Sequence, residues 1–207
     1  MGLQFTAYTQ IGLFNVNSAS PTFSAEAVTG LPLPTGALVG QRFYLGEEQA
    51  NQLTAGVAAI NGVTIQGHRG WYRTVQVDSG ATAANVAFGY IGAQASLAKG
   101  VNVVTSADVA LALGLNPCVF LGVVTPGNYT IVQDQGDATV YSTNAVTGGG
   151  GSGGTPHTVT YTSTHGQSAD SGGSTLPIGL VGVPEQTTAA AGLVRVSLGF
   201  PFGVKAD

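Results

Sequence analysis

The chain has 207 residues and a net charge of −4; 8% of the residues are charged, 43% are hydrophobic and 32 are glycines. The six Lys and Arg residues form no basic stripe, which argues against direct nucleic-acid binding, and no apolar stretch approaches the ~20 residues needed to span a membrane. Because so few residues are charged, we expect other chains to cover much of the surface.

The first 36 residues differ from the rest of the chain. They contain one charged residue and a stiff Leu-Pro-Leu-Pro stretch, and their apolar residues rarely alternate, so we predict an extended arm over residues 1–36. The arm either folds back on its own domain or lies against a neighbouring chain, and we predict that it anchors the protein to its partners. The candidate partner-binding residues are its four aromatics, Phe5, Tyr8, Phe14 and Phe23.

From Ala37 onwards, β-branched and aromatic runs bounded by glycine predict a β-rich domain over residues 37–207. The first two runs are Ala37–Gly46 and Gly70–Asp78. The best helical signal follows Thr105, where a hydroxyl can cap the first turn and a glycine can end the last. We therefore expect one short helix near Ala107–Leu113 and at most one more.

The segment Phe120–Ser142 predicts a β-meander. A strand over Val119–Val124 leads into a turn in which Pro126 presets φ and Gly127 supplies a positive φ. Residues 129–133 alternate as in a two-faced strand, residues 134–137 (Asp-Gln-Gly-Asp) look like a second turn, and residues 138–142 would return as the third strand.

Residues 146–175 are rich in glycine and serine and predict a loop region that holds one short strand. The last stretch again has the pattern of two apolar strands joined by a turn. Together these segments predict an all-β fold built from antiparallel strands.

Two stretches look like serine-hydrolase motifs. Residues 150–154 match the G-x-S-x-G pattern but lack the strand and helix that must flank it. Residues 169–174 resemble the Gly-Asp-Ser-Gly-Gly-Pro stretch of trypsin-like proteases, and His68 and Asp108 precede Ser171 in that family's order. Both ends of the motif differ, so we interpret these stretches as loops and predict no enzymatic activity and no cofactor.

Other polar residues have less specific patterns. The spacing of His157, His165 and Asp170 fits no familiar zinc site, so solvated loop residues are expected. Arg69 and Arg73 bracket Trp71 and Tyr72; they form either a stacking or carboxylate-pairing patch or, as the sequence favours, a solvated strand edge.

The single cysteine, Cys118, lies in an apolar run and is predicted to be a buried thiol. The N-terminus has neither the basic nor the apolar region of a signal peptide. Both features suit folding in a reducing cytoplasm.

The stretch Asn102–Val140 resembles the capsid decoration (cement) proteins of tailed bacteriophages, in which a similar pattern forms the central meander of a small, β-barrel-like "tulip" domain. The segment Gly192–Phe200 looks like the closing strand of that domain. The residues that carry the match are Gly122, Val123, Gly127, Tyr129, Val132, Gln133, Gly136, Ala138 and Val140.

The resemblance implies a homotrimer on the capsid surface that binds the major capsid protein and clamps neighbouring subunits after assembly in the bacterial cytoplasm. The main alternative is another virion β-module: a minor tail, fibre or baseplate component. A hydrolase and a secreted carbohydrate-binding or surface β-module also remain open.

Overall fold

A computed structural model describes residues 40, 42–47, 50–51, 67–81, 87–94, 102–105, 117–148, 159–161, 168–170 and 180–198. The predicted arm with Phe5, Tyr8, Phe14 and Phe23, the helix near Ala107–Leu113 and most of the 146–175 loop region lie outside these residues.

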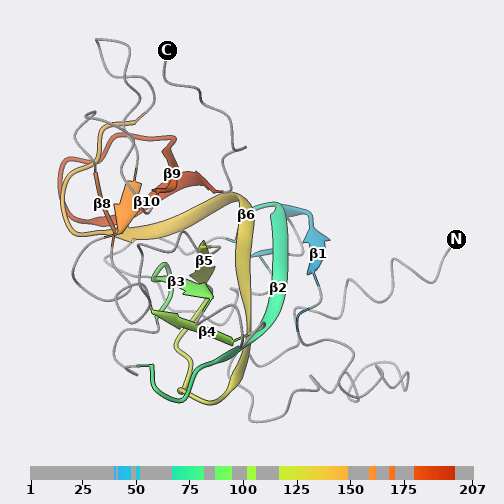
Figure 1. Cartoon of the computed structure of the whole chain (residues 1–207). Helices are drawn as coiled ribbons and strands as arrows, with labels where there is room; N and C mark the ends of the chain where they lie inside the picture. The colour runs from blue at the N-terminus through green and yellow to red at the C-terminus, as the bar shows by residue number, and fades with distance from the viewer. Residues whose placement is uncertain are drawn as a thin grey trace, which may run out of the picture.

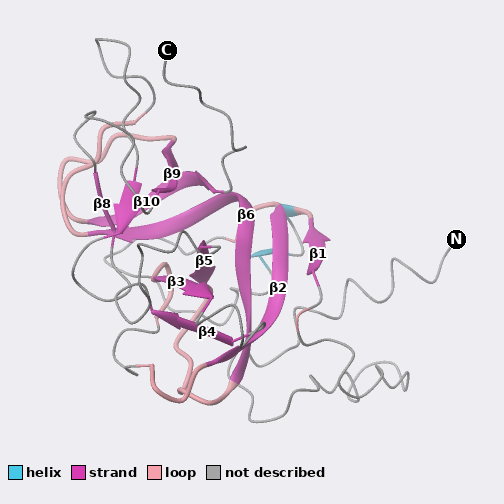
Figure 2. Cartoon of the chain, viewed as in Figure 1, coloured by secondary structure: helices cyan, strands magenta, loops and turns pink. Residues whose placement is uncertain are grey.

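The described part of the chain is built from β-strands (Figures 1 and 2), and only Glu47, Ala50 and Asn51 within it are helical. The all-β prediction is therefore confirmed. The strands are β1 (Arg42–Leu45), β2 (Gly70–Val77), β3 (Ile91–Gln94), β4 (Asn102–Thr105), β5 (Pro117–Phe120), β6 (Tyr129–Ser142), β7 (Val159–Tyr161), β8 (Ser168–Asp170), β9 (Leu180–Pro184) and β10 (Gly192–Leu198). None of the described helical residues belongs to a helix long and apolar enough to cross a membrane.

The ten strands form one mixed sheet in the order β1-β2-β4-β3-β5-β6-β10-β9-β7-β8. Most pairs are antiparallel, but β2–β4 and β6–β8 are parallel. The sheet is not the single closed barrel that the resemblance to decoration proteins implies. Instead it folds back along β6, whose first half pairs with β2 and β5 and whose second half pairs with β10 and β8. Figure 1 shows β6 as a long bent strand running between these two groups.

The predicted turn at residues 134–137 is wrong, because β6 continues through it. Trp71 pairs with Gln135 whereas Tyr72 pairs with Gln133, so Asp134 is the extra residue of a β-bulge. The bulge and a positive φ of 102° at Gly136 bend the strand without reversing it.

The predicted meander is wrong for the same reason. Residues 138–142 do not return along residues 129–133 but pair with β10, so that each half of β6 has its own neighbours. The preceding strand also ends earlier than predicted, at Phe120. The turn between them is confirmed: Gly127 has φ 90°, and the Asn128 amide donates to the Thr125 carbonyl at 3.0 Å.

Alternating apolar residues fill three core clusters beneath the sheet. The second half of β6 and β10 share one of them, in which every second residue of β10 from Val194 to Leu198 is buried. A second cluster joins β2, β5 and β6 around Phe120, and a third lies around Tyr72 and Leu45. Cys118 is fully buried in the second cluster, as predicted, and burial raises the pKa of its thiol to about 12.

Two glycines allow β2 and β6 to meet at the bend. A Cβ on Gly70 would lie 2.2 Å from the Gln135 carbonyl oxygen, and one on Gly136 would lie 2.7 Å from the Arg69 carbonyl oxygen. Since these neighbours are backbone atoms, no larger residue fits at either position without moving a strand. This close crossing places the side chains of Asp134 and Asp137 beside those of β1, β2 and β10.

Candidate interaction surface

An exposed aromatic pair lies on the outer face of β1 and β2. Arg42 and Tyr44 are two residues apart and therefore point to the same side of β1, and Tyr44 is the register partner of Trp71. The two rings pack edge to face with centroids 5.7 Å apart, at an interplanar angle of 72°. Nevertheless Tyr44 is 49% exposed and Trp71 41% exposed. We call these three residues the Arg42–Tyr44–Trp71 patch.

Arg42 is held in place over the indole ring. Its guanidinium carbon lies 5.4 Å from the centroid of Trp71, within the range of a cation–π contact. Both carboxylate oxygens of Asp134 face it: Nε lies 3.1 Å from Oδ2, and Nη2 donates to Oδ1 at 3.1 Å. Nη2 also donates to Gln135 Oε1 at 3.3 Å. The bulge of β6 thus supplies the acceptors that fix this arginine.

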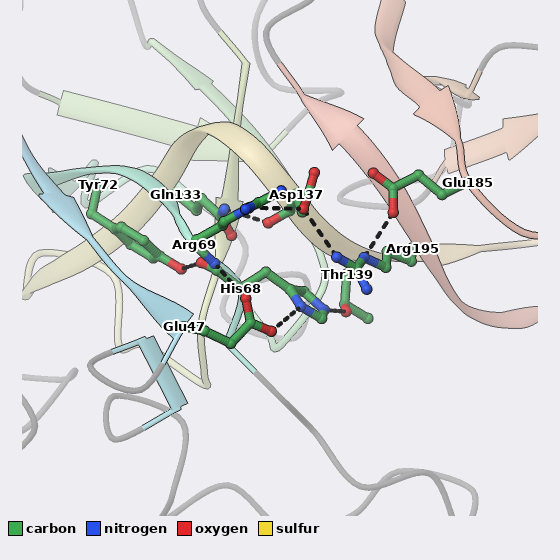
Figure 3. Close-up of polar contacts among 9 residues, drawn as sticks. All are labelled: Glu47, His68, Arg69, Tyr72, Gln133, Asp137, Thr139, Glu185 and Arg195. Atoms are coloured by element: carbon green, nitrogen blue, oxygen red, sulfur yellow. Dashed lines mark hydrogen bonds and ion pairs between the residues drawn. The ribbon is translucent and has the colours of Figure 1, made fainter.

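A second polar cluster lies at the bend of β6 (Figure 3). Asp137 Oδ2 accepts a 2.9 Å hydrogen bond from Arg195 Nη2 and lies 3.7 Å from Arg69 Nε, while Arg195 Nε lies 2.7 Å from Glu185 Oε2. Burial raises the pKa of Asp137, but hydrogen bonds from Arg195 and Glu185 and the two arginine charges outweigh it, so this pKa lies below its usual value. The pKa of Glu185 is raised, by burial and by the neighbouring Asp137.

His68 connects the start of β2 to the middle of β6. Its Nδ1 lies 3.4 Å from Glu47 Oε1, its Nε2 lies 3.0 Å from Thr139 Oγ1, and its carbonyl accepts a hydrogen bond from the Tyr72 hydroxyl. The imidazole is buried, and Figure 3 shows its contacts with Glu47 and Thr139. The arrangement joins three segments of chain at the junction of the two halves of the sheet.

The structure brings together only some of the predicted site residues. Asp108 and Ser171, which would complete a triad with His68, lie outside the described residues, as do His157 and His165. Within the described ranges, no group of three His, Cys, Asp or Glu side chains could hold a metal ion.

For Arg73, the carboxylate-pairing interpretation is confirmed and the favoured solvated strand edge is wrong, whereas Arg69 lies 3.7 Å from Asp137 Oδ2 but is 69% exposed and largely solvated. Strand β2 is not an edge, because β1 and β4 pair along one side of it and β6 pairs along the other. Arg73 is 12% exposed, and its Nε lies 3.7 Å from Asp134 Oδ2. Of the two aromatic residues between these arginines, Trp71 is exposed, whereas Tyr72 is buried in the core.

Sequence reasoning missed two parts of this surface. Alternation within the short run Arg42–Leu45 could have placed Arg42 and Tyr44 on one face, but nothing in it identifies Trp71 as their neighbour. Asp134 lies in a turn-like sequence, and its role as an acceptor depends on a bulge between β2 and β6, which are distant in sequence.

Comparisons with known proteins include a solved phage structure that resembles this fold. No family model matches the sequence, and no curated protein matches it. Among solved structures, the chain is similar to the N base of the head fibre protein gp8.5 of bacteriophage phi29. The TM-score is 0.42 at 16% identity, and the alignment covers 62% of this chain and 92% of the phage protein chain.

Proposed function

We propose that this protein is a structural component of a bacteriophage virion that decorates the capsid and stabilises it by binding between major capsid protein subunits. The protein would act as a homotrimer on the capsid surface, with no enzymatic activity and no cofactor. Its N-terminal arm, residues 1–36, would contribute to anchoring through Phe5, Tyr8, Phe14 and Phe23.

One observation carries the proposal: six of the nine residues that resemble the decoration proteins lie in β6, at the structural centre of the fold. Gly127 is the positive-φ residue of the turn between β5 and β6, and Tyr129 to Val140 lie within β6, the strand on which both groups of strands assemble. Gly136, which has a positive φ and no room for a Cβ, is the residue at which β6 bends.

The composition supports the same role. Only 16 of the 207 residues are charged at neutral pH, counting six Lys and Arg and ten Asp and Glu. A protein with so few charges gains solubility when neighbouring chains cover part of its surface, as in a closed oligomer or an assembled shell.

Cryo-electron microscopy of particles made with and without the protein tests the proposal. We expect extra density at the contacts between capsomers when the protein is present, and earlier loss of the genome on heating when it is absent. Density confined to the tail, to a fibre or to the baseplate would instead support the alternative virion role. Particles that never contain the protein would refute both.

Deleting residues 1–34 tests the arm separately. If the arm is an anchor, the truncated protein stays folded by circular dichroism but no longer binds particles. A truncated protein that binds as before, or that unfolds, would contradict this part of the proposal.

A further inference from the structure

We infer that the Arg42–Tyr44–Trp71 patch, together with the neighbouring Arg69, is the surface that docks on the shell subunit. The complementary surface on that subunit would present a carboxylate next to an apolar side chain. This inference rests on the proposed function and adds to it the binding residues and the chemistry of the partner.

The first argument is the kind of side chain that is left exposed. The exposed large hydrophobics among the described residues are Tyr44, Trp71 and Val123, and the first two are neighbours on adjacent strands. Tyrosine, tryptophan and arginine are the residues that contribute most to protein–protein interfaces, and here all three occur together. Since about half of each ring is already packed, the remainder can be buried without any rearrangement of the sheet.

The second argument is that the patch is rigid before any partner arrives. Arg42 has its rotamer fixed by Asp134 and Gln135, and the two aromatic rings hold each other. Both aromatics lie on paired strands and not on a loop. Binding to a preformed surface avoids most of the entropy lost when long side chains are immobilised.

The third argument is the unused hydrogen-bonding capacity of the arginines. The contacts of Arg42 with Asp134 and Gln135 use Nε and Nη2. The side chain of Arg69 is 69% exposed, and its ion pair with a described residue is a 3.7 Å contact with Asp137. Of the two arginines, Arg69 is the less tightly paired, and its guanidinium can bind a carboxylate of the partner, which favours an acidic group there.

The same geometry disfavours a sugar as the occupant. A sugar ring would stack on an open face of Trp71, but the Arg42 guanidinium lies over this ring and Tyr44 packs against it edge to face. A protein partner can instead bury the outer edges of both rings and pair with the arginines at the same time.

Two variants and a matched control test the inference by co-sedimentation with shells that lack the protein. Trp71→Ala removes the aromatic anchor, and Arg69→Glu reverses an exposed charge while leaving Asp137 its bond to Arg195. We expect each to weaken binding at least about tenfold. Val123→Ala truncates an apolar side chain that is 70% exposed outside the patch, and we expect it to bind within about twofold of the wild type.

The outcomes separate this inference from the proposed function. If the wild type binds shells and both folded variants bind them as tightly as the wild type does, the patch is not the docking surface, although the decoration role stands. If the wild type does not bind shells, both ideas fail. If Trp71→Ala does not fold, Arg69→Glu decides the matter alone. A patch whose mutation abolishes binding to a glycan but leaves shell binding intact would also overturn the inference.

Discussion

Replacing Gly136 by alanine tests whether the bend of β6 depends on the close crossing of two backbones. Gly136 has φ 102°, and an added Cβ would lie 2.7 Å from the Arg69 carbonyl oxygen and 2.8 Å from the Gly70 Cα. Both neighbours are main-chain atoms, so neither can move away as a flexible side chain would. Relief of the clash requires β2 and β6 to separate where they support the whole sheet.

Gly127→Ala is a matched control. Gly127 also has a positive φ, 90°, but nothing lies within 4 Å of the added methyl group. Each substitution forces an L-residue into a left-handed conformation, at about 1–2 kcal/mol, and each lowers the entropy of the unfolded chain equally. The difference between them therefore isolates the steric contribution, which overpacking in other proteins puts at about 1–3 kcal/mol.

We thus expect Gly127→Ala to lower the free energy of unfolding by about 1–2 kcal/mol and Gly136→Ala to lower it by about 2–5 kcal/mol. The assay is urea unfolding followed by far-UV circular dichroism and by the fluorescence of Trp71, the single tryptophan. A Gly136→Ala protein that does not fold at all would agree with the argument. Equal losses within about 0.5 kcal/mol would refute it, because the crossing would then impose no steric requirement.

Three further predictions concern buried or paired groups. Because burial raises the pKa of Cys118 to about 12, this thiol should resist alkylation at pH 8 until the protein is unfolded, and rapid labelling of the native protein would contradict this. The free energy of unfolding should also decline as the pH rises above about 9, where the thiol of the unfolded chain ionises. Tyr72→Phe should cost about 1 kcal/mol in urea unfolding, since the His68 carbonyl loses its buried donor, and no loss would show that the hydrogen bond contributes nothing. The pKa of Asp137 is lowered in the folded state, so its contribution to stability is present above its ordinary pKa of 3.8 and is lost as pH falls through the folded value. Asp137→Asn should therefore be less stable than the wild type at pH 7, with a gap that narrows below pH 4; a constant gap would exclude the pairing with Arg195 as its cause.

The class of the fold and several local features follow from residue patterns along the chain. Glycine-bounded runs of β-branched and aromatic residues predict strands, because such side chains pack well on a pleated surface, and β2 and β10 lie where these runs occur. The turn at Pro126 and Gly127 was predictable because each residue restricts or frees its own φ. Burial of Cys118 followed from its apolar neighbours along the chain.

The pairing of β6, in contrast, depends on contacts between segments that are distant in sequence. Residues 134–137 have turn residues, but the pairing of one half of the strand with β2 and of the other half with β10 outweighs that local preference. The candidate surface was decided in the same way. Arg42 and Trp71 are far apart in sequence, and Asp134 faces Arg42 only because a bulge between β2 and β6 turns it outward. Local patterns fix which residues can form strands, whereas the partners of a strand depend on long-range hydrogen bonds that no local pattern encodes.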